Sequence, residues 1–334
     1  MADLRTKYMG LELGNPLVVS SSGFTGNVDG VRACADNGAG AVVLKSMFEE
    51  LIVSHSRDLD QELLKSEHPE AYDYVRAQIG MQLGPRPYLR FIEEALSKVN
   101  IPVIASVNCV SPRWWVPYAQ DIESAGAHAI ELNISHFPQG GDNDFRDIER
   151  QYARIVAEVC GRVKIPVSVK IGPFFTSIGD VAREIAAAGA SGIVLFNRYY
   201  TVDVNTETGK FAPAVTFSSP QEISLPLRWT GLLANTLDCD IAASTGIHDS
   251  LGVIKVLQAG AAAAYLCTTL YRNGVSRLGT IRDELNGWLD SHGHRSVSDI
   301  RGMAAREAGS AEVLLHRLQY IKALDEAGKY EKRA

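Results

Sequence analysis

The sequence predicts a single-domain (β/α)8 barrel over residues 1–334, and three observations support this fold class. Short apolar runs and Ala-Gly-Ala segments alternate until they make eight candidate strands. Segments with helical periodicity lie between them, and polar residues follow the strand ends. Repeated strand and helix units build a parallel sheet, and eight such units close into a barrel. A doubly wound open sheet is the alternative, because it uses the same units.

The eight candidate strands are of two kinds. Four are apolar runs introduced by Pro or Asp, at 16–20, 102–106, 166–170 and 240–244. Four follow an Ala-Gly-Ala or similar segment, at 38–45, 125–133, 188–197 and 259–267. The glycine in each of the second kind can end the preceding helix, because positive φ costs glycine little.

Helical periodicity places helices between the strands. The expected helices are 28–37, 90–99, 115–124, 145–159, 179–188 and 251–259. Two connections are longer than a simple turn: about 46–86 follows the second strand, and about 198–226 follows the sixth. Both begin at the carboxyl end of a strand, where barrels carry catalytic loops and lids. The tail from about 280 to 334 predicts two or three amphipathic helices.

Composition argues against several classes of function. The formal charge of −6 and the lack of a basic cluster interleaved with aromatic residues make nucleic acid a poor partner. The longest apolar run, 259–266, is too short to cross a bilayer, and residues 1–10 do not resemble a signal peptide. Five cysteines without a CxxC pair fit reduced thiols, so we expect a cytoplasmic protein without membrane attachment.

Familiar short motifs are missing as well. The sequence contains no GxGxxG at a strand-to-helix turn, and no GxxxxGK[ST], HExxH or GxSxG. The eight histidines do not have metal-ligand spacing, so no metal site is expected.

Polar residues follow all eight candidate strands. Carboxyl ends of barrel strands meet on one face, so these side chains would line a single pocket that binds a small molecule. They are Ser20, Ser21, Ser22 and Gly23; Lys45 and Ser46; Ser106 and Asn108; Asn133, Ser135 and His136; Lys170; Asn197; Ser244, Thr245 and Gly246; Cys267 and Thr268.

Two features of this set suggest its ligand. The turns after the last two strands can bind a phosphate through backbone N–H groups and a helix that begins near Ser250. Lys45 and Lys170 point inward and need an anionic partner, which an electron-rich ring such as reduced flavin would supply. Alternatively, each lysine pairs with a carboxylate such as Glu49 or Glu131. A non-redox aldolase or isomerase, with Lys170 forming a Schiff base, is a further alternative.

Residues 15–274 resemble the dihydroorotate dehydrogenase family, with weaker similarity at 296–302. The resemblance lies in the strand ends. The matching segments are Asn15-Pro16 to Ser22-Gly23, Leu44-Lys45-Ser46, Glu131-Leu-Asn-Ile-Ser135, Val169-Lys170, Ser244-Thr-Gly-Ile247, Gly260-Ala261 and Thr268.

The resemblance implies an FMN-dependent barrel of the class 1 type that oxidises dihydroorotate to orotate in pyrimidine biosynthesis. Hydride would pass to flavin N5 while a base removes the neighbouring proton. The implied catalytic residues are His136 and Lys45, and the implied substrate contacts are Asn133, Ser135 and Asn197. The implied FMN contacts are Ser21, Ser22, Gly23, Lys45, Ser46, Ser106, Asn108, Asn133, Lys170, Asn197, Ser244, Thr245, Gly246, Cys267 and Thr268. The soluble members of the family suggest a homodimer, formed through the 198–226 insertion.

The chain departs from the family pattern at several positions. His136 stands where class 1 members carry cysteine and class 2 members serine. Gln139 replaces an asparagine after the Pro138 position, and the stretch 80–84 lacks another. Thr245 and Cys267 replace glycines of the phosphate turns. A different cyclic amide or enone is therefore an alternative substrate, and the sequence leaves the electron acceptor open.

Overall fold

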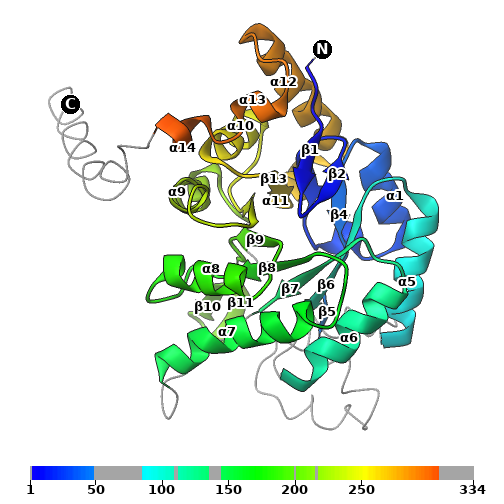
Figure 1. The fold of residues 1–334 in the computed structure, drawn as a ribbon, viewed down its shortest axis with the longest axis vertical. Coiled ribbons are helices and arrows are strands. Elements are labelled where there is room, and N and C mark those ends of the chain that lie inside the picture. Colours follow the sequence, from blue (N-terminus) through cyan, green and yellow to red (C-terminus); the bar gives the residue numbers. More distant parts are fainter. Residues whose placement is uncertain are drawn as a thin grey trace, which may run out of the picture.

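The computed structural model describes residues 2–48, 85–108, 112–134, 144–198, 201–214 and 217–307. A closed barrel of parallel strands forms its centre (Figure 1). Its strands are β3 (Leu17–Val19), β4 (Ala41–Val43), β6 (Val103–Asn108), β7 (Ala129–Asn133), β8 (Val167–Ile171), β9 (Gly192–Leu195), β12 (Asp240–Ser244) and β13 (Ala263–Leu266). Pairing of β13 with β3 and of β4 with β6 closes the ring, which confirms the barrel and excludes the open sheet. The short strand β5 (Met47–Phe48) pairs with the far end of β6.

Helices cover the outside of the barrel. They are α1 (Val28–Asp36), α5 (Pro85–Lys98), α6 (Pro112–Ser124), α7 (Phe145–Cys160), α8 (Ile178–Ala187), α9 (Ser224–Leu233) and α10 (Ser250–Ala259). All six expected helices are present. Helix α9 begins at Ser224, within the stretch to Pro226 that was interpreted as an insertion, because proline is tolerated in the first turn of a helix. The glycines before four strands do have positive φ, as expected: 92° at Gly38, 87° at Gly126, 105° at Gly189 and 120° at Gly260.

Successive residues of each strand face opposite sides of the sheet, and this alternation positions the polar mouth. Val42 and Leu44 pack outward against helices, whereas Ala41 and Val43 belong to the apolar cluster inside the barrel. Lys45 therefore continues the inward row. By the same parity, the inward rows of β3 and β7 end in Ser20 and Asn133.

A hairpin that was not expected closes the amino end of the barrel. It consists of β1 (Thr6–Tyr8) and β2 (Leu11–Leu13), joined by a turn in which Met9 and Gly10 both have positive φ, as in a type I′ hairpin. Tyr8 and Met9 are buried at the amino end of the barrel. Their packing is tight, because a Cβ on Gly192 would lie 2.9 Å from Met9 Cγ. With this end filled, the open mouth lies at the carboxyl ends of the strands.

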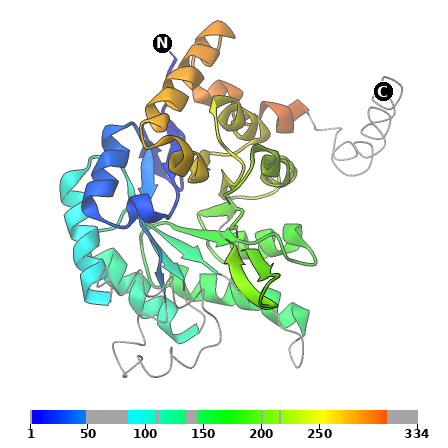
Figure 2. The same ribbon diagram turned by 180° about the vertical axis from the view of Figure 1, so that it is seen from behind.

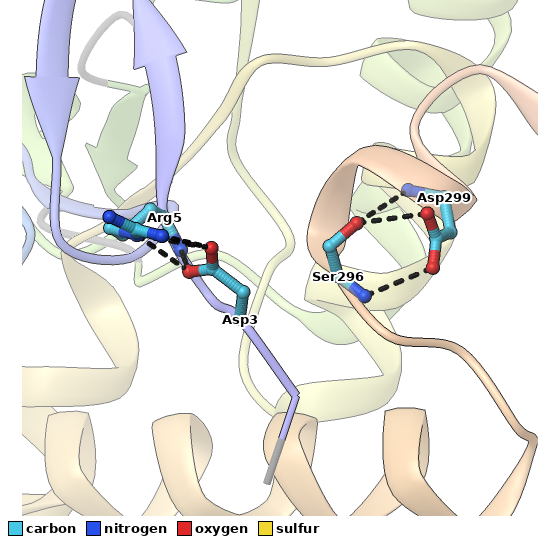
Figure 3. Close-up of polar contacts among 4 residues, drawn as sticks. All are labelled: Asp3, Arg5, Ser296 and Asp299. Atoms are coloured by element: carbon cyan, nitrogen blue, oxygen red, sulfur yellow. Dashed lines mark hydrogen bonds and ion pairs between the residues drawn. The ribbon is translucent and has the colours of Figure 1, made fainter.

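The N-terminal segment is also tied to the C-terminal helices, which lie beside it in both views (Figures 1 and 2). Asp3 N donates to Arg295 O at 2.8 Å, and Val297 N donates to Asp3 O at 3.0 Å. Figure 3 shows the side chains that stiffen the two partners: Asp3 binds Arg5, and Ser296 and Asp299 form a reciprocal cap.

The remaining helices are α11 (Thr268–Asn273), α12 (Arg277–Ser291), α13 (Val297–Ile300) and α14 (Met303–Glu307), in agreement with the expected helical tail as far as Glu307. Within the insertion after the sixth barrel strand, β10 (Thr201–Asn205) and β11 (Lys210–Ala214) form a hairpin that faces the reader in Figure 2, and the 3-10 helix η2 (Pro220–Ile223) follows it. Most of the 46–86 insertion and all of 308–334 lie outside the described residues. None of the helices described here has the length and apolarity needed to span a membrane.

Candidate active site

Two lysines face the inside of the mouth. Lys45 and Lys170 are each only 8% exposed. Burial lowers the pKa of Lys45, and a Cβ on Gly26 would lie 3.3 Å from Lys45 Cδ, so the glycine leaves room for the lysine stem. Lys170 lies opposite Asn133 in the register of β7 and β8. Within the described part of the chain, its ammonium takes part in no hydrogen bond or ion pair. The expected inward orientation is confirmed, and the suggested ion pair between Lys170 and Glu131 does not form.

Three hydroxyl groups from successive strand ends form a continuous chain. Ser46 Oγ lies 3.1 Å from Ser21 Oγ and 2.7 Å from Ser106 Oγ, and Ser46 N donates to Ser21 Oγ at 2.9 Å. Tyr88 of α5 supports the chain from outside the sheet, because its hydroxyl donates to Ser106 O and accepts from Ser106 N. These three serines, which the sequence places at the ends of different strands, therefore share one side of the mouth. Asn108 lies half-buried at the end of β6 on the same side.

Two amides come from the strands on either side of β8, the strand that carries Lys170. Asn197 Nδ2 donates to Asn133 Oδ1 at 2.9 Å. This bond leaves the Asn133 amide nitrogen as a donor and the Asn197 carbonyl oxygen as an acceptor. The pair can bind a ligand that carries both an acceptor and a donor, such as an imide or a cyclic amide.

The loop after β3 is held by a residue that the sequence did not indicate. Gly23 N donates to the Tyr271 hydroxyl at 2.8 Å, and a Cβ at Gly23 would lie 2.7 Å from that oxygen. The Tyr271 ring lies 4.6 Å from Phe24 and stacks on Phe217 at 5.5 Å. The Gly23 N–H is therefore used within the protein. Toward a flavin, we expect Gly23 to act only by letting the ring come close to the backbone. Ser22, the residue before it, begins the 3-10 helix η1 (Gly23–Thr25).

The turns after β12 and β13 lie close together. Thr245 and Gly246 both have positive φ, 82° and 78°, and backbone N–H groups in turns can bind anions. Thr268 Oγ1 accepts from Ser218 N at 3.3 Å, which joins the last turn to the insertion. Ser244 is buried, and Cys267 is half-buried.

Two details of these turns correct the sequence interpretation. A Cβ at Gly246 would lie 2.1 Å from Ile223 N, so glycine is required there by the backbone of the neighbouring segment. Helix α10 does begin at Ser250, but the Asp249 carboxylate caps it by accepting from Gly252 N at 2.8 Å. An anion at the turns would therefore use the N–H groups of the loops, because this helix end already has a carboxylate.

His248 lies at the same turns and was missed. Its Nε2 is 3.2 Å from Ser218 Oγ, and its backbone oxygen accepts from Thr269 Oγ1 at 2.8 Å. Burial lowers the pKa of His248, and the positive charge of Arg272 lowers it further. The imidazole is therefore neutral near pH 7, and an anion bound beside it would raise its pKa.

The residues of the mouth fit a flavin. The Lys170 ammonium is buried and has no acceptor among the residues that the structure describes, which suits a ring that accepts electrons and gains negative charge. Ser20 Oγ is also buried and has no hydrogen-bond partner in the described structure. The turn at Thr245 and Gly246 has backbone N–H groups that can hold a phosphate.

Four residues named in the sequence analysis, Ser135, His136, Glu49 and Cys109, lie outside the described residues.

The described cysteines form no disulfide. Cys34, Cys160, Cys239 and Cys267 are free thiols. Across the described ranges, no three His, Cys, Asp or Glu side chains lie close enough together to hold a metal ion.

Comparison with known proteins gives consistent matches. A family model described as "Dihydroorotate dehydrogenase" matches residues 66–289. The chain is 29% identical over 310 residues to a "Putative dihydroorotate dehydrogenase A (fumarate)" of Aeropyrum pernix, covering 91% of this chain and 98% of that protein. It is 26% identical over 321 residues to a "Dihydroorotate dehydrogenase B (NAD(+)), catalytic subunit" of Thermoplasma acidophilum, covering 92% and 100%. The corresponding protein of Pyrococcus abyssi is 27% identical over 313 residues, covering 91% and 99%.

Proposed function

The chain belongs to the dihydroorotate dehydrogenase family, and from that premise we propose that it binds FMN at the barrel mouth and oxidises dihydroorotate to orotate. It is a flavin-dependent oxidoreductase that acts on a CH–CH bond. The observation that carries the proposal is Lys170, whose buried ammonium has no acceptor of its own among the described residues. A ring that becomes negative on reduction would supply that acceptor.

Each group of residues has a separate task in this proposal. Bound FMN supplies the acceptor for the two electrons and one proton that leave the substrate as hydride. Lys170 and Lys45 balance the charge gained at the mouth, and the Asn133–Asn197 pair holds the substrate imide or carboxylate. The linked hydroxyl groups of Ser21, Ser46 and Ser106 fix the side of the mouth formed by β3, β4 and β6. The turns at Thr245–Gly246 and Cys267–Thr268 hold the phosphate through backbone N–H groups.

His136 is the proposed base. It occupies the position at which the family carries Cys or Ser, and imidazole is a competent base near neutral pH. A base at this point takes the proton from the carbon next to the one that loses hydride.

A second candidate is oxidation or reduction of another cyclic amide or enone on the same scaffold. Gln139 and the 80–84 stretch favour it, because a site that binds its substrate through paired hydrogen bonds loses discrimination when partners are missing. The aldolase alternative has lost its support, because the family carries out redox chemistry.

The test uses the purified protein. We expect it to be yellow, and heat-released cofactor should have the mass of FMN. Anaerobic mixing with dihydroorotate should bleach the flavin absorbance. Absence of bleaching at saturating dihydroorotate, in a protein that holds flavin, would remove the substrate and favour the second candidate. Colourless protein that cannot be reconstituted with FMN would remove the cofactor.

A homodimer is also part of the proposal. The hairpin β10–β11 exposes Val202, Val204 and Phe211 at 59%, 47% and 78%, and Val204 pairs with Phe211 in its register, so the apolar side chains share one face. We propose that a second copy of the chain covers this face. Sedimentation should find a dimer for the parent and a monomer for Phe211→Asp; a monomeric parent would contradict the proposed dimer.

A cytoplasmic location is proposed as well.

A further inference from the structure

Glu131 is a buried carboxyl directly below the site. It lies on the inward face of β7, between Ala129 and Asn133, and is 1% exposed. Its Oε2 has no hydrogen-bond partner among the described residues. Glu131 lies opposite Ser168 in the register of β7 and β8, and Lys170 is two residues further along β8. A buried carboxylate without a full set of donors is costly, so its surroundings favour the neutral form more than water does.

The groups that interact with Glu131 come from four elements. Lys170 of β8 is the cation, and the rings of Tyr265 of β13 and Tyr8 of β1 lie inside the barrel with it. Tyr88 of α5 senses the Glu131 charge from the outer side of the sheet. Tyr265 and Tyr8 lie with their hydroxyl oxygens 3.3 Å apart. Burial raises the pKa of Glu131, and the Lys170 charge and the Tyr265 hydroxyl oppose that rise. The charge on Glu131 therefore depends on how much of the Lys170 field it receives.

We propose that Glu131 takes up a proton when the bound flavin is reduced and releases it on reoxidation, with Lys170 as the link between the two. This inference rests on the proposed function, because it requires a flavin beside Lys170. Beside a neutral oxidised ring, the Lys170 charge stabilises the Glu131 carboxylate. Negative charge gained by the ring competes for the same ammonium, so the carboxylate becomes less favourable and binds a proton.

Electrons and protons balance in this scheme. The substrate gives two electrons and one proton as hydride and a second proton to the base. Glu131 receives an additional proton from solvent. Its protonation removes one negative charge below the mouth and so offsets the negative charge that the reduced ring gains. Glu131 is thus a positioning residue for the Lys170 charge and does not touch the substrate.

The pH dependence of the flavin midpoint potential tests the proposal. For a two-electron couple, each proton taken up shifts the potential by about 30 mV per pH unit. The parent should approach the two-proton slope of about 60 mV per pH unit over the range in which Glu131 changes charge. Glu131→Gln should keep the one-proton slope throughout, and Glu94→Gln, an exposed glutamate on α5, should match the parent.

A second measurement needs no variant. A reduced-minus-oxidised infrared spectrum of the parent should contain a new C=O stretch of a protonated carboxylic acid, and 13C-labelled glutamate should move that band. Equal potential slopes in parent and Glu131→Gln, or absence of a glutamate band, would overturn this inference while leaving flavin binding and dihydroorotate oxidation intact. A chain that binds no flavin would overturn the proposed function together with it.

Discussion

Asn197 Nδ2 donates a hydrogen bond of 2.9 Å to Asn133 Oδ1, and Lys170 lies on the strand between them. This bond fixes both amides, since Asn133 has used its acceptor and Asn197 one donor. Polar residues from three adjacent strands therefore meet at this part of the mouth, and the two amides among them are oriented.

Asn197→Ala should weaken substrate binding more than flavin binding. Loss of its amide removes one polar contact and frees Asn133 to rotate. We expect the KM for dihydroorotate to rise roughly fivefold to tenfold, corresponding to about 1 kcal/mol per lost hydrogen bond. Steady-state kinetics and flavin titration measure the two effects. Asn100→Ala, on the exposed loop before β6, is the control, and an equal change in the two variants would remove the assigned role.

Tyr271→Phe should loosen the loop after β3 and weaken flavin binding. The variant keeps the ring that packs on Phe24 and Phe217 but leaves Gly23 N without its acceptor. We expect the flavin Kd to rise about fivefold, from the loss of about 1 kcal/mol. Fluorescence titration of the apoprotein measures it. Phe217→Ala separates stacking from hydrogen bonding, and an unchanged Kd in Tyr271→Phe would show that the hydroxyl contact does not matter for the cofactor.

Much of the fold could be predicted because local patterns carry it. Gly126 has positive φ as the Ala-Gly-Ala segment implied, and the inward row ending in Lys45 follows from strand alternation. The β1–β2 hairpin was missed because each strand has three residues, too few for a pattern to stand out. The extent of the single domain, residues 1–334, stays a prediction.

The site was only partly predictable. Lys45, Asn133 and Lys170 were found because strand ends in a barrel converge by topology. Tyr271 and His248 were missed because their role depends on contacts between loops distant in sequence, for which no local pattern exists. Gly246 was selected for a phosphate, whereas the backbone of Ile223 also requires a glycine there. Sequence patterns thus identify the lining of the mouth better than its supports.

His136→Ala should slow flavin reduction by dihydroorotate while leaving flavin binding nearly unchanged. A general base contributes about 100-fold to 10,000-fold to the rate of proton transfer. Anaerobic stopped-flow absorbance measures the reduction rate. His136→Cys, which restores the class 1 residue type, should recover part of the rate at high pH. Equal losses of binding and reduction in His136→Ala would point to a structural role.

The N-terminal attachment should be sensitive to acid. Arg5 lowers the pKa of Asp3 from 3.8 to about 2 by hydrogen bonding to its carboxylate. A lowered folded-state pKa stabilises the fold above the unfolded value, and that contribution is lost as the pH falls toward 2. The protection of Val297 N–H, which donates to Asp3 O, should be lower in Asp3→Asn than in the parent above pH 4. The difference should vanish near pH 2, and a constant difference would contradict the assignment.

His248 should report on the phosphate. Its pKa is lowered from 6.5, first by burial and then by the Arg272 charge, so the folded apoprotein disfavours the protonated form. Its contribution to stability is therefore present above pH 6.5 and is lost as the pH falls through 6.5 toward the folded-state pKa. A phosphate at the turns beside it would add negative charge and raise the His248 pKa.

Histidine NMR titrations with two ligands test this placement. FMN should raise the pKa of His248, whereas riboflavin, which has the same ring without phosphate, should leave it low. The resonances of His128, which is exposed before β7 at the other end of the barrel, serve as the control and should not respond to either ligand. Equal shifts of His248 with FMN and riboflavin would mean that the ring, not the phosphate, lies near these turns, and the proposed orientation of the cofactor would then have to be reversed.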